Sequence, residues 1–358
     1  MQPDPSVRKV LIYRIGSLGD TVVALPSFHL IARSFPRAER WMLTNFPVHA
    51  KAPASASVLG ESGLVHGYMR YTVGTRNPTE LLRLSWRIRR FNPDVLVYLT
   101  PARGEQAVRR DALFFQFSGV RRIVGLPEGE LASSRFDPAT GLWEREAARL
   151  LRCIDSLGMM DLSDLASWDL RLTNAETRRA DRMLAPVGGA PLIACGPGTK
   201  MQAKEWGRER WRELLAKLSR ELPGHALVLV GAKEDAEVSE YAAGSWKGSV
   251  VNLCGQLTPR ESAAVLRCAK LFLGADSGPM HLAAAYGVSC VIPFAALDLP
   301  GRWYPIGVQH RSIYHQVECA GCRLTTCIEK KKVCIESITV GEVFQAAMQV
   351  ICREEIAS

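Results

Sequence analysis

The sequence has no apolar run long enough to cross a membrane. None of its stretches approaches the roughly 18 to 20 uninterrupted apolar residues of a transmembrane helix, although 47% of its 358 residues are hydrophobic. The opening residues, MQPDPSVRK, also lack the apolar segment of a signal peptide. We therefore expect a cytoplasmic protein, long enough for two domains with a sizeable core.

Lysine is scarce in the first half of the chain. Residues 1–180 contain 25 Lys and Arg against 18 Asp and Glu, and 23 of those 25 cations are arginine. The planar guanidinium group of arginine suits bidentate binding of carboxylate or phosphate. The first half is therefore expected to meet an anionic substrate or surface, with a solvated basic face as the alternative.

A glycine is missing from what could be a dinucleotide-binding motif near the N-terminus. The segment VLIYRIGSLGD (10–20) has the pattern of a strand and a glycine turn, and residues 21–32 have that of a helix, despite a proline. The G-x-G-x-x-G motif needs one glycine more than Gly16 and Gly19. Asp20 either caps the helix or presents a carboxylate to a ligand at the carboxyl edge of a parallel sheet.

Strand-like and helical patterns alternate along the chain, with no internal repeat or low-complexity segment. Such alternation is typical of parallel sheets covered by helices, which predicts the α/β class with two Rossmann-like domains. Proline and glycine interrupt residues 185–191 (APVGGAP), which form the expected linker. The expected strands are 10–15, 40–45, 94–100, 121–126, 191–196, 226–231, 249–255, 271–276 and 289–295, and the expected helices include 79–91, 144–157, 209–221 and 260–269.

Two glycine-containing loops in the second half follow apolar strands. In GPGTKMQAKEW (196–206) the glycines allow close approach of an anion, and Lys200 and Lys204 can reach it, although the spacing is not that of a Walker A loop. Two solvated lysines on a plain loop are the alternative. Glu234 and Asp235 follow the next strand, where a carboxylate could bind ribose hydroxyls or cap a helix.

The segment LFLGADSGPMHLAAAYGV (271–288) joins a buried strand to a helix rich in small residues. Pro279 lies near the first helical position, where a missing N–H group costs nothing. The free N–H groups of this first turn and the positive end of the helix dipole predict an anion site. The residues assigned to it are Ser277, Gly278, Met280 and His281, which follow Asp276.

These segments together carry a resemblance. RIGSLGD, GPGTKMQAKEW and DSGPMHLAAAYG, in this order over most of the chain, resemble motifs of the family 9 glycosyltransferases, the ADP-heptose:lipopolysaccharide heptosyltransferases. The resemblance implies a GT-B fold, with an acceptor domain (1–184), a nucleotide-sugar domain (185–335) and a final helix (336–358) packing back on the first domain. It also implies an inverting, metal-independent transfer of heptose from ADP-heptose to a Kdo or heptose of the lipopolysaccharide inner core.

The resemblance gives roles to individual residues. Asp20 resembles the catalytic base, Lys204 the phosphate-binding lysine, and Asp276 the ligand of the donor sugar. The other expected donor-binding residues are Gly19, Thr199, Lys200, Glu234, Asp235, Leu257, Ser277, Gly278, Met280 and His281. Alternatives left open are a protein or other glycan acceptor, a GT-B nucleotide-sugar epimerase, and a binding protein without turnover.

The acceptor side is less defined by the sequence. Arg103, Arg109 and Arg110 follow the strand at 94–100 and could hold an acidic sugar or phosphate. The helix at 79–91 could rest on an anionic membrane surface, with a core-packed helix as the alternative. The expected partners are thus ADP-heptose, an anionic lipid-linked glycan and the cytoplasmic face of the inner membrane, but no nucleic acid.

Nine of the ten cysteines fall into two groups, and Cys352 lies near the C-terminus apart from both. Cys153, Cys195, Cys254, Cys268 and Cys290 occur singly in apolar or helical contexts, as buried thiols do. Four others lie within 16 residues, a spacing that favours a structural zinc or iron site, with packed thiols or disulfides as alternatives. These four are Cys319, Cys322, Cys327 and Cys334.

Overall fold

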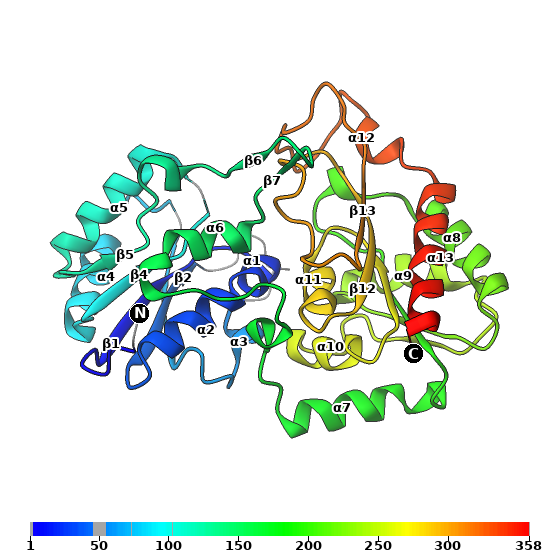
Figure 1. The fold of residues 1–358 in the computed structure, drawn as a ribbon, viewed down its shortest axis with the longest axis horizontal. Coiled ribbons are helices and arrows are strands. Elements are labelled where there is room, and N and C mark those ends of the chain that lie inside the picture. Colours follow the sequence, from blue (N-terminus) through cyan, green and yellow to red (C-terminus); the bar gives the residue numbers. More distant parts are fainter. Residues whose placement is uncertain (1–2, 46–54, 73, 102, 358) are drawn as a thin grey trace. The chain divides into compact units, whose positions relative to one another are not determined.

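The computed structural model describes residues 3–45, 55–72, 74–101 and 103–357. The chain divides into two compact units, Met1–Leu170 and Arg171–Ser358. Each unit is built on its own parallel sheet, of five strands in the first and six in the second, with helices along both (Figure 1). This confirms the predicted α/β class with two sheets.

The first unit has the strand order β3-β2-β1-β4-β5. The order reverses between β1 and β4, so ligands of such a sheet bind beyond the carboxyl ends of these two strands. Helices α4 and α5 bury Leu84, Ile88 and Phe115 against Leu11 and Tyr98 of the sheet. The strands are β1 (Lys9–Tyr13), β2 (Glu39–Asn45), β3 (Gly67–Tyr71), β4 (Val95–Tyr98) and β5 (Ile123–Val124); the helices are α1 (Leu18–Val23), α2 (Leu25–Ser34), α3 (Ser55–Leu59), α4 (Pro78–Phe91), α5 (Glu105–Phe117) and α6 (Glu146–Cys153), with a small hairpin of β6 (Phe136–Asp137) and β7 (Leu142–Trp143).

The first helix of this unit is shorter than expected. A single helix was expected over 21–32, but α1 ends at Val23 and α2 begins at Leu25. Pro26 lies in the first turn of α2, where its missing N–H group has no intrahelical partner to lose. The proline therefore starts a second helix instead of interrupting one.

The second unit has the strand order β10-β9-β8-β11-β12-β13, which reverses between β8 and β11. Its core includes Trp206 and Trp211, whose rings meet edge to face at 4.8 Å between centroids. The strands are β8 (Leu192–Gly196), β9 (Ala226–Leu229), β10 (Val250–Asn252), β11 (Leu271–Gly274), β12 (Ser289–Phe294) and β13 (Arg311–Tyr314); the helices are α7 (Asn174–Leu184), α8 (Arg208–Glu221), α9 (Ala236–Ala243), α10 (Pro259–Leu266), α11 (Gly278–Ala285), α12 (Val333–Glu336) and α13 (Val340–Ala357).

Two helices near the expected domain limits pack within the second unit. On α7, Glu176 accepts a hydrogen bond of 2.5 Å from Arg260 Nε of α10, so α7 belongs with this unit and the expected linker at 185–191 lies inside it. The final helix, α13, runs beside α8 (Figure 1) and buries Val343 and Val350 in the same core, whereas it was expected to pack on the first domain. Among the described residues, no helix is both long and apolar enough to cross a membrane.

Candidate functional site

Asp20 lies in the first turn of α1, directly after the carboxyl end of β1. Its Oδ2 accepts hydrogen bonds from the backbone N of Ser17 (2.7 Å) and from Ser17 Oγ (2.8 Å). Ser17 is the N-cap residue and Asp20 is N3, so this contact is half of a capping box. Asp20 therefore caps the helix from N3, and its side chain remains 20% exposed.

The turn before Asp20 requires glycine at position 16. Gly16 has a φ of +147°, and a Cβ there would lie 2.4 Å from the Cβ of Asp20. Any side chain would therefore push Asp20 from its place. Gly19, which was expected to contact the donor, is buried within α1.

A buried arginine, not singled out in the sequence, joins the two strands at this edge. Arg14 is 1% exposed and donates from Nη1 to the carbonyl oxygen of Leu99, just beyond β4, at 2.7 Å. Its Nη2 donates to the carbonyl oxygen of Asp20 at 2.6 Å and lies 3.7 Å from Asp20 Oδ1. Arg14 thus fixes the backbone of Asp20 and places a positive charge beside its second carboxylate oxygen.

The expected acceptor arginines surround a second carboxylate, Asp111 of α5. Arg103 Nη1 lies 3.2 Å from Asp111 Oδ2, and Arg110 Nη2 lies 2.9 Å from Oδ1. Tyr98 also donates to Asp111, and burial raises the pKa of this tyrosine. Arg109 is exposed. Arg103 and Arg110 are thus held by Asp111, a partner that the sequence did not indicate.

The second unit brings Lys204 and Asp276 together. Lys204 Nζ lies 2.6 Å from Asp276 Oδ2 and also donates to the carbonyl oxygen of Asp276. Lys204 follows β8 and Asp276 follows β11, the neighbouring strands where the order reverses. Two residues predicted separately from the sequence therefore form one ion pair at the edge where such sheets bind ligands.

Helix α11 begins beside this pair. Ser277 is its N-cap residue, and the buried Oγ of Ser277 has no hydrogen-bond partner in the described part of the chain. Pro279 lies in the first turn, and His281 is 9% exposed. Met280 is fully buried, so only its backbone N–H group can serve a ligand. A free hydroxyl and the N–H groups of Gly278 and its neighbours fit an anion.

The remaining expected donor residues lie in loops at the same edge. Asp235 Oδ2 accepts a hydrogen bond from Ala232 N at 2.8 Å. The carboxylate of Asp235 also lies close to Gly198, because a Cβ at position 198 would be only 2.2 Å from Asp235 Cγ. Asp235 is thus engaged in supporting the loops after β8 and β9, whereas Glu234 beside it is exposed. Of the others, Lys200 is exposed, and Thr199 and Leu257 are half-buried.

Residues 325–338 form hydrogen bonds to the loop that carries Lys204. Four hydrogen bonds join the two segments: Cys327 N to Gln202 Oε1 (2.9 Å), Ala203 N to Thr325 O (3.2 Å), Lys332 Nζ to Glu205 O (2.9 Å) and Trp206 Nε1 to Ile338 O (2.9 Å). The cysteine-rich segment therefore supports the loop that follows β8 and carries Lys204.

The four clustered cysteines are free thiols, of which Cys327 and Cys334 are buried and Cys319 and Cys322 are half-buried. All ten cysteines are free, and Cys327 and Cys334 belong to the core of the second unit, with Cys322 packed against it. Over the described residues, no three His, Cys, Asp or Glu side chains gather as metal ligands. The arrangement therefore does not fit the structural metal site that the spacing favoured. Among the single cysteines, Cys268 is exposed, contrary to expectation, because it lies in the turn after α10.

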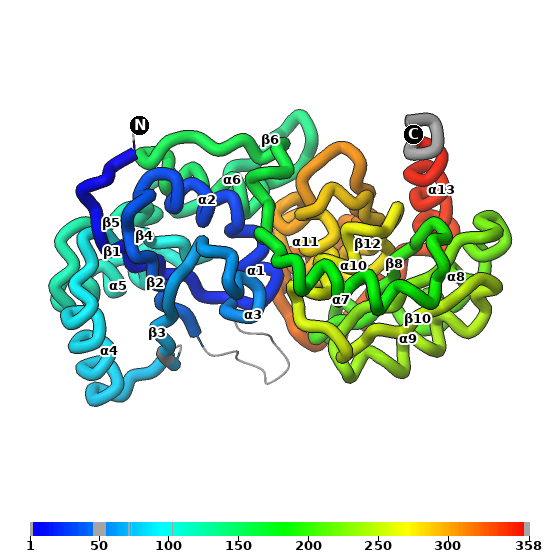
Figure 2. Tube along the Cα trace, turned by 90° about the horizontal axis from the view of Figure 1, so that it is seen from below, coloured from blue at the N-terminus to red at the C-terminus, as the bar shows by residue number. Residues whose placement is uncertain are grey.

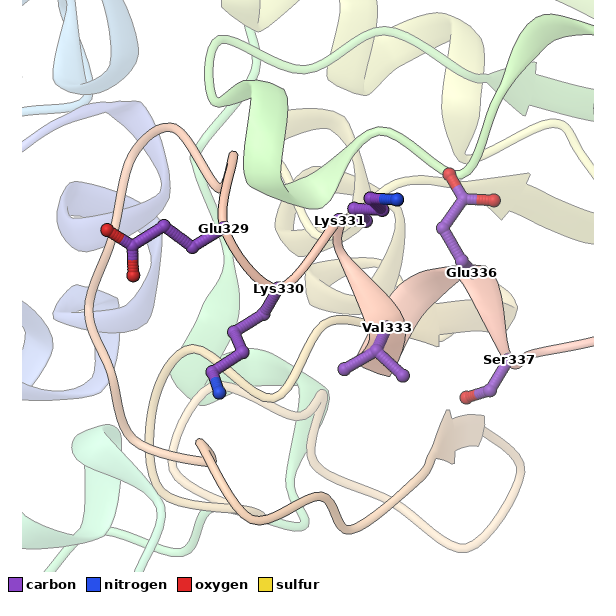
Figure 3. A pocket seen from close by; sticks show the side chains of 6 residues that line it. All are labelled: Glu329, Lys330, Lys331, Val333, Glu336 and Ser337. Atoms are coloured by element: carbon purple, nitrogen blue, oxygen red, sulfur yellow. The ribbon is translucent and has the colours of Figure 1, made fainter.

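An open hollow of about 460 Å³ lies beside α12 on the 325–338 segment, and none of the expected site residues lines it (Figure 3). Its walls carry charges of both signs and no donor residue. The lining residues are Glu329, Lys330, Lys331, Val333, Glu336 and Ser337. The lining of this hollow therefore does not resemble the expected anion site at the N-terminus of α11.

Comparison with known proteins identifies the family. Residues 148–333, more than half of the chain, match the model of glycosyltransferase family 9 (heptosyltransferase). The chain belongs to glycosyltransferase family 9. This confirms the resemblance seen in the sequence, and the protein is a glycosyltransferase.

One curated relative and two solved structures extend this result. Lipopolysaccharide heptosyltransferase 1 of Pseudomonas aeruginosa is 24% identical over 89% of this chain and 87% of its own. A family 9 glycosyltransferase of Veillonella parvula matches with a TM-score of 0.70 at 16% identity over 99% of both chains. ADP-heptose LPS heptosyltransferase II of E. coli matches with a TM-score of 0.66 at 18% identity, over 97% of this chain and 99% of that one. The structures share the fold, which confirms the GT-B class.

Proposed function

We propose that this glycosyltransferase moves heptose from ADP-heptose to a Kdo or heptose acceptor of the lipopolysaccharide inner core, with inversion and without a catalytic metal. The main support is the Lys204–Asp276 pair beside the N-terminus of α11, at the edge where the strand order of the second sheet reverses. The family and two relatives, a lipopolysaccharide heptosyltransferase and an ADP-heptose LPS heptosyltransferase, support the sugar and the acceptor class.

In this proposal the second unit binds the diphosphate of the donor. The ammonium of Lys204, the hydroxyl of Ser277 and the N–H groups of the first turn of α11 stabilise the negative charge that grows on the leaving ADP. The carboxylate of Asp276, which is paired with Lys204, binds a hydroxyl of the donor sugar in this proposal. These groups can neutralise a diphosphate without a metal ion.

Asp20 acts as the general base in the proposed reaction. Its carboxylate takes the proton of the acceptor hydroxyl, the hydroxyl oxygen bonds to the anomeric carbon, and the bond from that carbon to ADP breaks with its electrons leaving on the phosphate. Oδ2 is occupied by the Ser17 cap, so Oδ1 is the oxygen that receives the proton.

The test is to incubate the purified protein with ADP-heptose and deacylated, water-soluble acceptors ending in Kdo or in heptose. Mass spectrometry should detect one added heptose on the acceptor and one free ADP per transfer, and NMR should show the inverted anomer. Turnover of ADP-heptose without addition to any acceptor would contradict the proposal. An altered nucleotide sugar formed without acceptor would indicate an epimerase instead.

A further inference from the structure

The outer faces of α4 and α5 carry four exposed apolar side chains. Leu82 and Trp86 of α4 are both 59% exposed, and Leu113 and Phe117 of α5 are 59% and 60% exposed. Each pair has i,i+4 spacing, which places its two members on one side of their helix. These large apolar side chains remain exposed to water, although each helix buries other apolar side chains against the first sheet.

The two helices lie next to each other on the first sheet (Figure 2), and an arginine joins their exposed sides. Arg89 of α4 donates to the carbonyl oxygen of Phe117 and places its guanidinium 5.4 Å from the centre of the Phe117 ring. Arg90 stands in the same way over Trp86, also at 5.4 Å. The exposed rings are therefore each covered in part by a cation.

The charge around these apolar groups has one sign. Between Leu81 and Phe91, α4 contains four arginines and no acidic residue; they are Arg83, Arg87, Arg89 and Arg90. On the facing stretch of α5 the acidic residue is Asp111, which is buried and paired with Arg103 and Arg110. Arg83 has no ion-pair partner among the residues that the structure describes. We call Leu82, Trp86, Leu113 and Phe117, with the four arginines of α4, the α4–α5 face.

We propose that the α4–α5 face rests on the surface of an anionic phospholipid bilayer. The apolar side chains enter the boundary between headgroups and acyl chains, and the exposed guanidinium groups of α4 face the phosphates. Two of these groups are also anchored to the protein, because Arg87 donates to the carbonyl oxygen of Arg70 at 3.2 Å and Arg89 to that of Phe117. Tryptophan is enriched at this interface, and arginine is enriched in the segments that flank it on the cytoplasmic side. Two copies of the chain facing each other here would oppose arginines to arginines, so charge complementarity favours the bilayer over self-association.

This inference deepens the proposed function, because an acceptor linked to lipid A would lie in such a bilayer. The two can fail separately. Vesicle binding needs neither donor nor acceptor, and transfer to a deacylated acceptor needs no vesicle. A protein that binds vesicles but transfers no heptose would remove the proposed acceptor and leave the α4–α5 face in place.

The experiment measures co-flotation of the full chain with vesicles of phosphatidylcholine alone and of phosphatidylcholine mixed with phosphatidylglycerol. We expect binding to the anionic vesicles, weakened by added salt, and little binding to the neutral ones. Equal partitioning into both would overturn the proposal, as would no partitioning into either.

Two variants connect the binding to this face. Arg83→Gln with Arg87→Gln should weaken partitioning about 25-fold, about fivefold for each cation removed. The matched control is Arg178→Gln with Arg182→Gln, two exposed arginines at the same spacing on α7, which should change nothing. Equal loss in both double variants would show attraction by net charge alone and would overturn the assignment to this face.

The apolar part is tested by Trp86→Ala with Phe117→Ala, which should weaken partitioning about 100-fold, about tenfold for each aromatic ring withdrawn from the interface. Met159→Ala with Val308→Ala removes side chains that are 88% and 92% exposed elsewhere and is the control. All variants should keep the rate on the deacylated acceptor. If the wild type forms a dimer that dissociates in the Trp86 and Phe117 variant, and does not bind vesicles, the face serves self-association instead.

Discussion

Replacing Asp20 with asparagine separates its role in capping from its proposed role as a base. An asparagine oxygen can still accept from Ser17 N, which now lies 2.7 Å from Asp20 Oδ2. What the helix loses is a negative charge in its first turn, worth about 0.3–1 kcal/mol. For a unit of this size that corresponds to a fall in Tm of at most about 4 °C.

The effect on catalysis should be much larger. A neutral amide cannot take the proton of the acceptor hydroxyl, so kcat should fall at least about 100-fold, the lower end for loss of acid–base catalysis. Steady-state release of ADP gives kcat, calorimetry gives the affinity for ADP, and thermal unfolding gives Tm. The affinity for ADP should stay at the wild-type value, because the proposed diphosphate ligands all follow β8 or β11.

Ser17→Ala is the matched control. It removes the 2.8 Å bond from Ser17 Oγ to Asp20 but keeps the carboxylate and the backbone N–H donor. Its stability should fall by about 0.5–1.5 kcal/mol, as for loss of one hydrogen bond, while kcat should change only a few-fold. If Asp20→Asn transfers sugar at close to the wild-type rate, Asp20 is a capping residue and the base lies elsewhere.

Three further changes test other parts of the structure. Lys204→Ala should weaken ADP binding by calorimetry about 10- to 150-fold, the value of a charge-assisted hydrogen bond, whereas Lys247→Ala, at an exposed lysine, should not. Arg260→Gln should destabilise the protein by about 1.5–3 kcal/mol near neutral pH. Burial raises the pKa of Glu176, but the bonds from Arg260 and Thr173 outweigh it and hold this pKa below 4.5. Urea titrations should therefore show the difference in stability between variant and wild type shrinking as the pH falls through that lowered pKa. Elemental analysis should find well below one zinc or iron per chain, and Cys322→Ser should melt with the wild type; one metal per chain, lost in this variant, would restore the four-cysteine site.

The central strands could be predicted because they are buried on both faces. Segments such as VLIY, VLVY and LFLG are continuous apolar runs, and each lies inside a sheet. The edge strands β3 and β13, GYMRY and RSIY, were missed because an edge strand can keep polar side chains in water. The limit between the two domains was expected after α7, whereas α7 belongs to the second unit through the bond from Arg260 to Glu176. A local sequence pattern cannot predict a contact between residues so far apart in the sequence.

The same division applies to the site. Sequence position predicted that Lys204 and Asp276 lie at one edge of a parallel sheet, because each follows an apolar strand. It could not predict that they pair with each other, since that depends on β8 and β11 being neighbours. Arg14 was missed because it is the first residue after a buried strand, and its nearly complete burial is not visible in the sequence.

The two interpretations of Asp20 that the sequence left open are compatible in the structure. A capping box uses one carboxylate oxygen, and here Ser17 engages Oδ2 through both of its donors. Oδ1 keeps Arg14 Nη2 as a neighbour at 3.7 Å, beyond the length of a direct hydrogen bond, so it can still accept a proton. Because the cap fixes the side chain and Gly16 leaves room for it, the orientation of Oδ1 is set before the acceptor arrives. In the proposed reaction the helix cap thus positions the carboxylate that acts as the base.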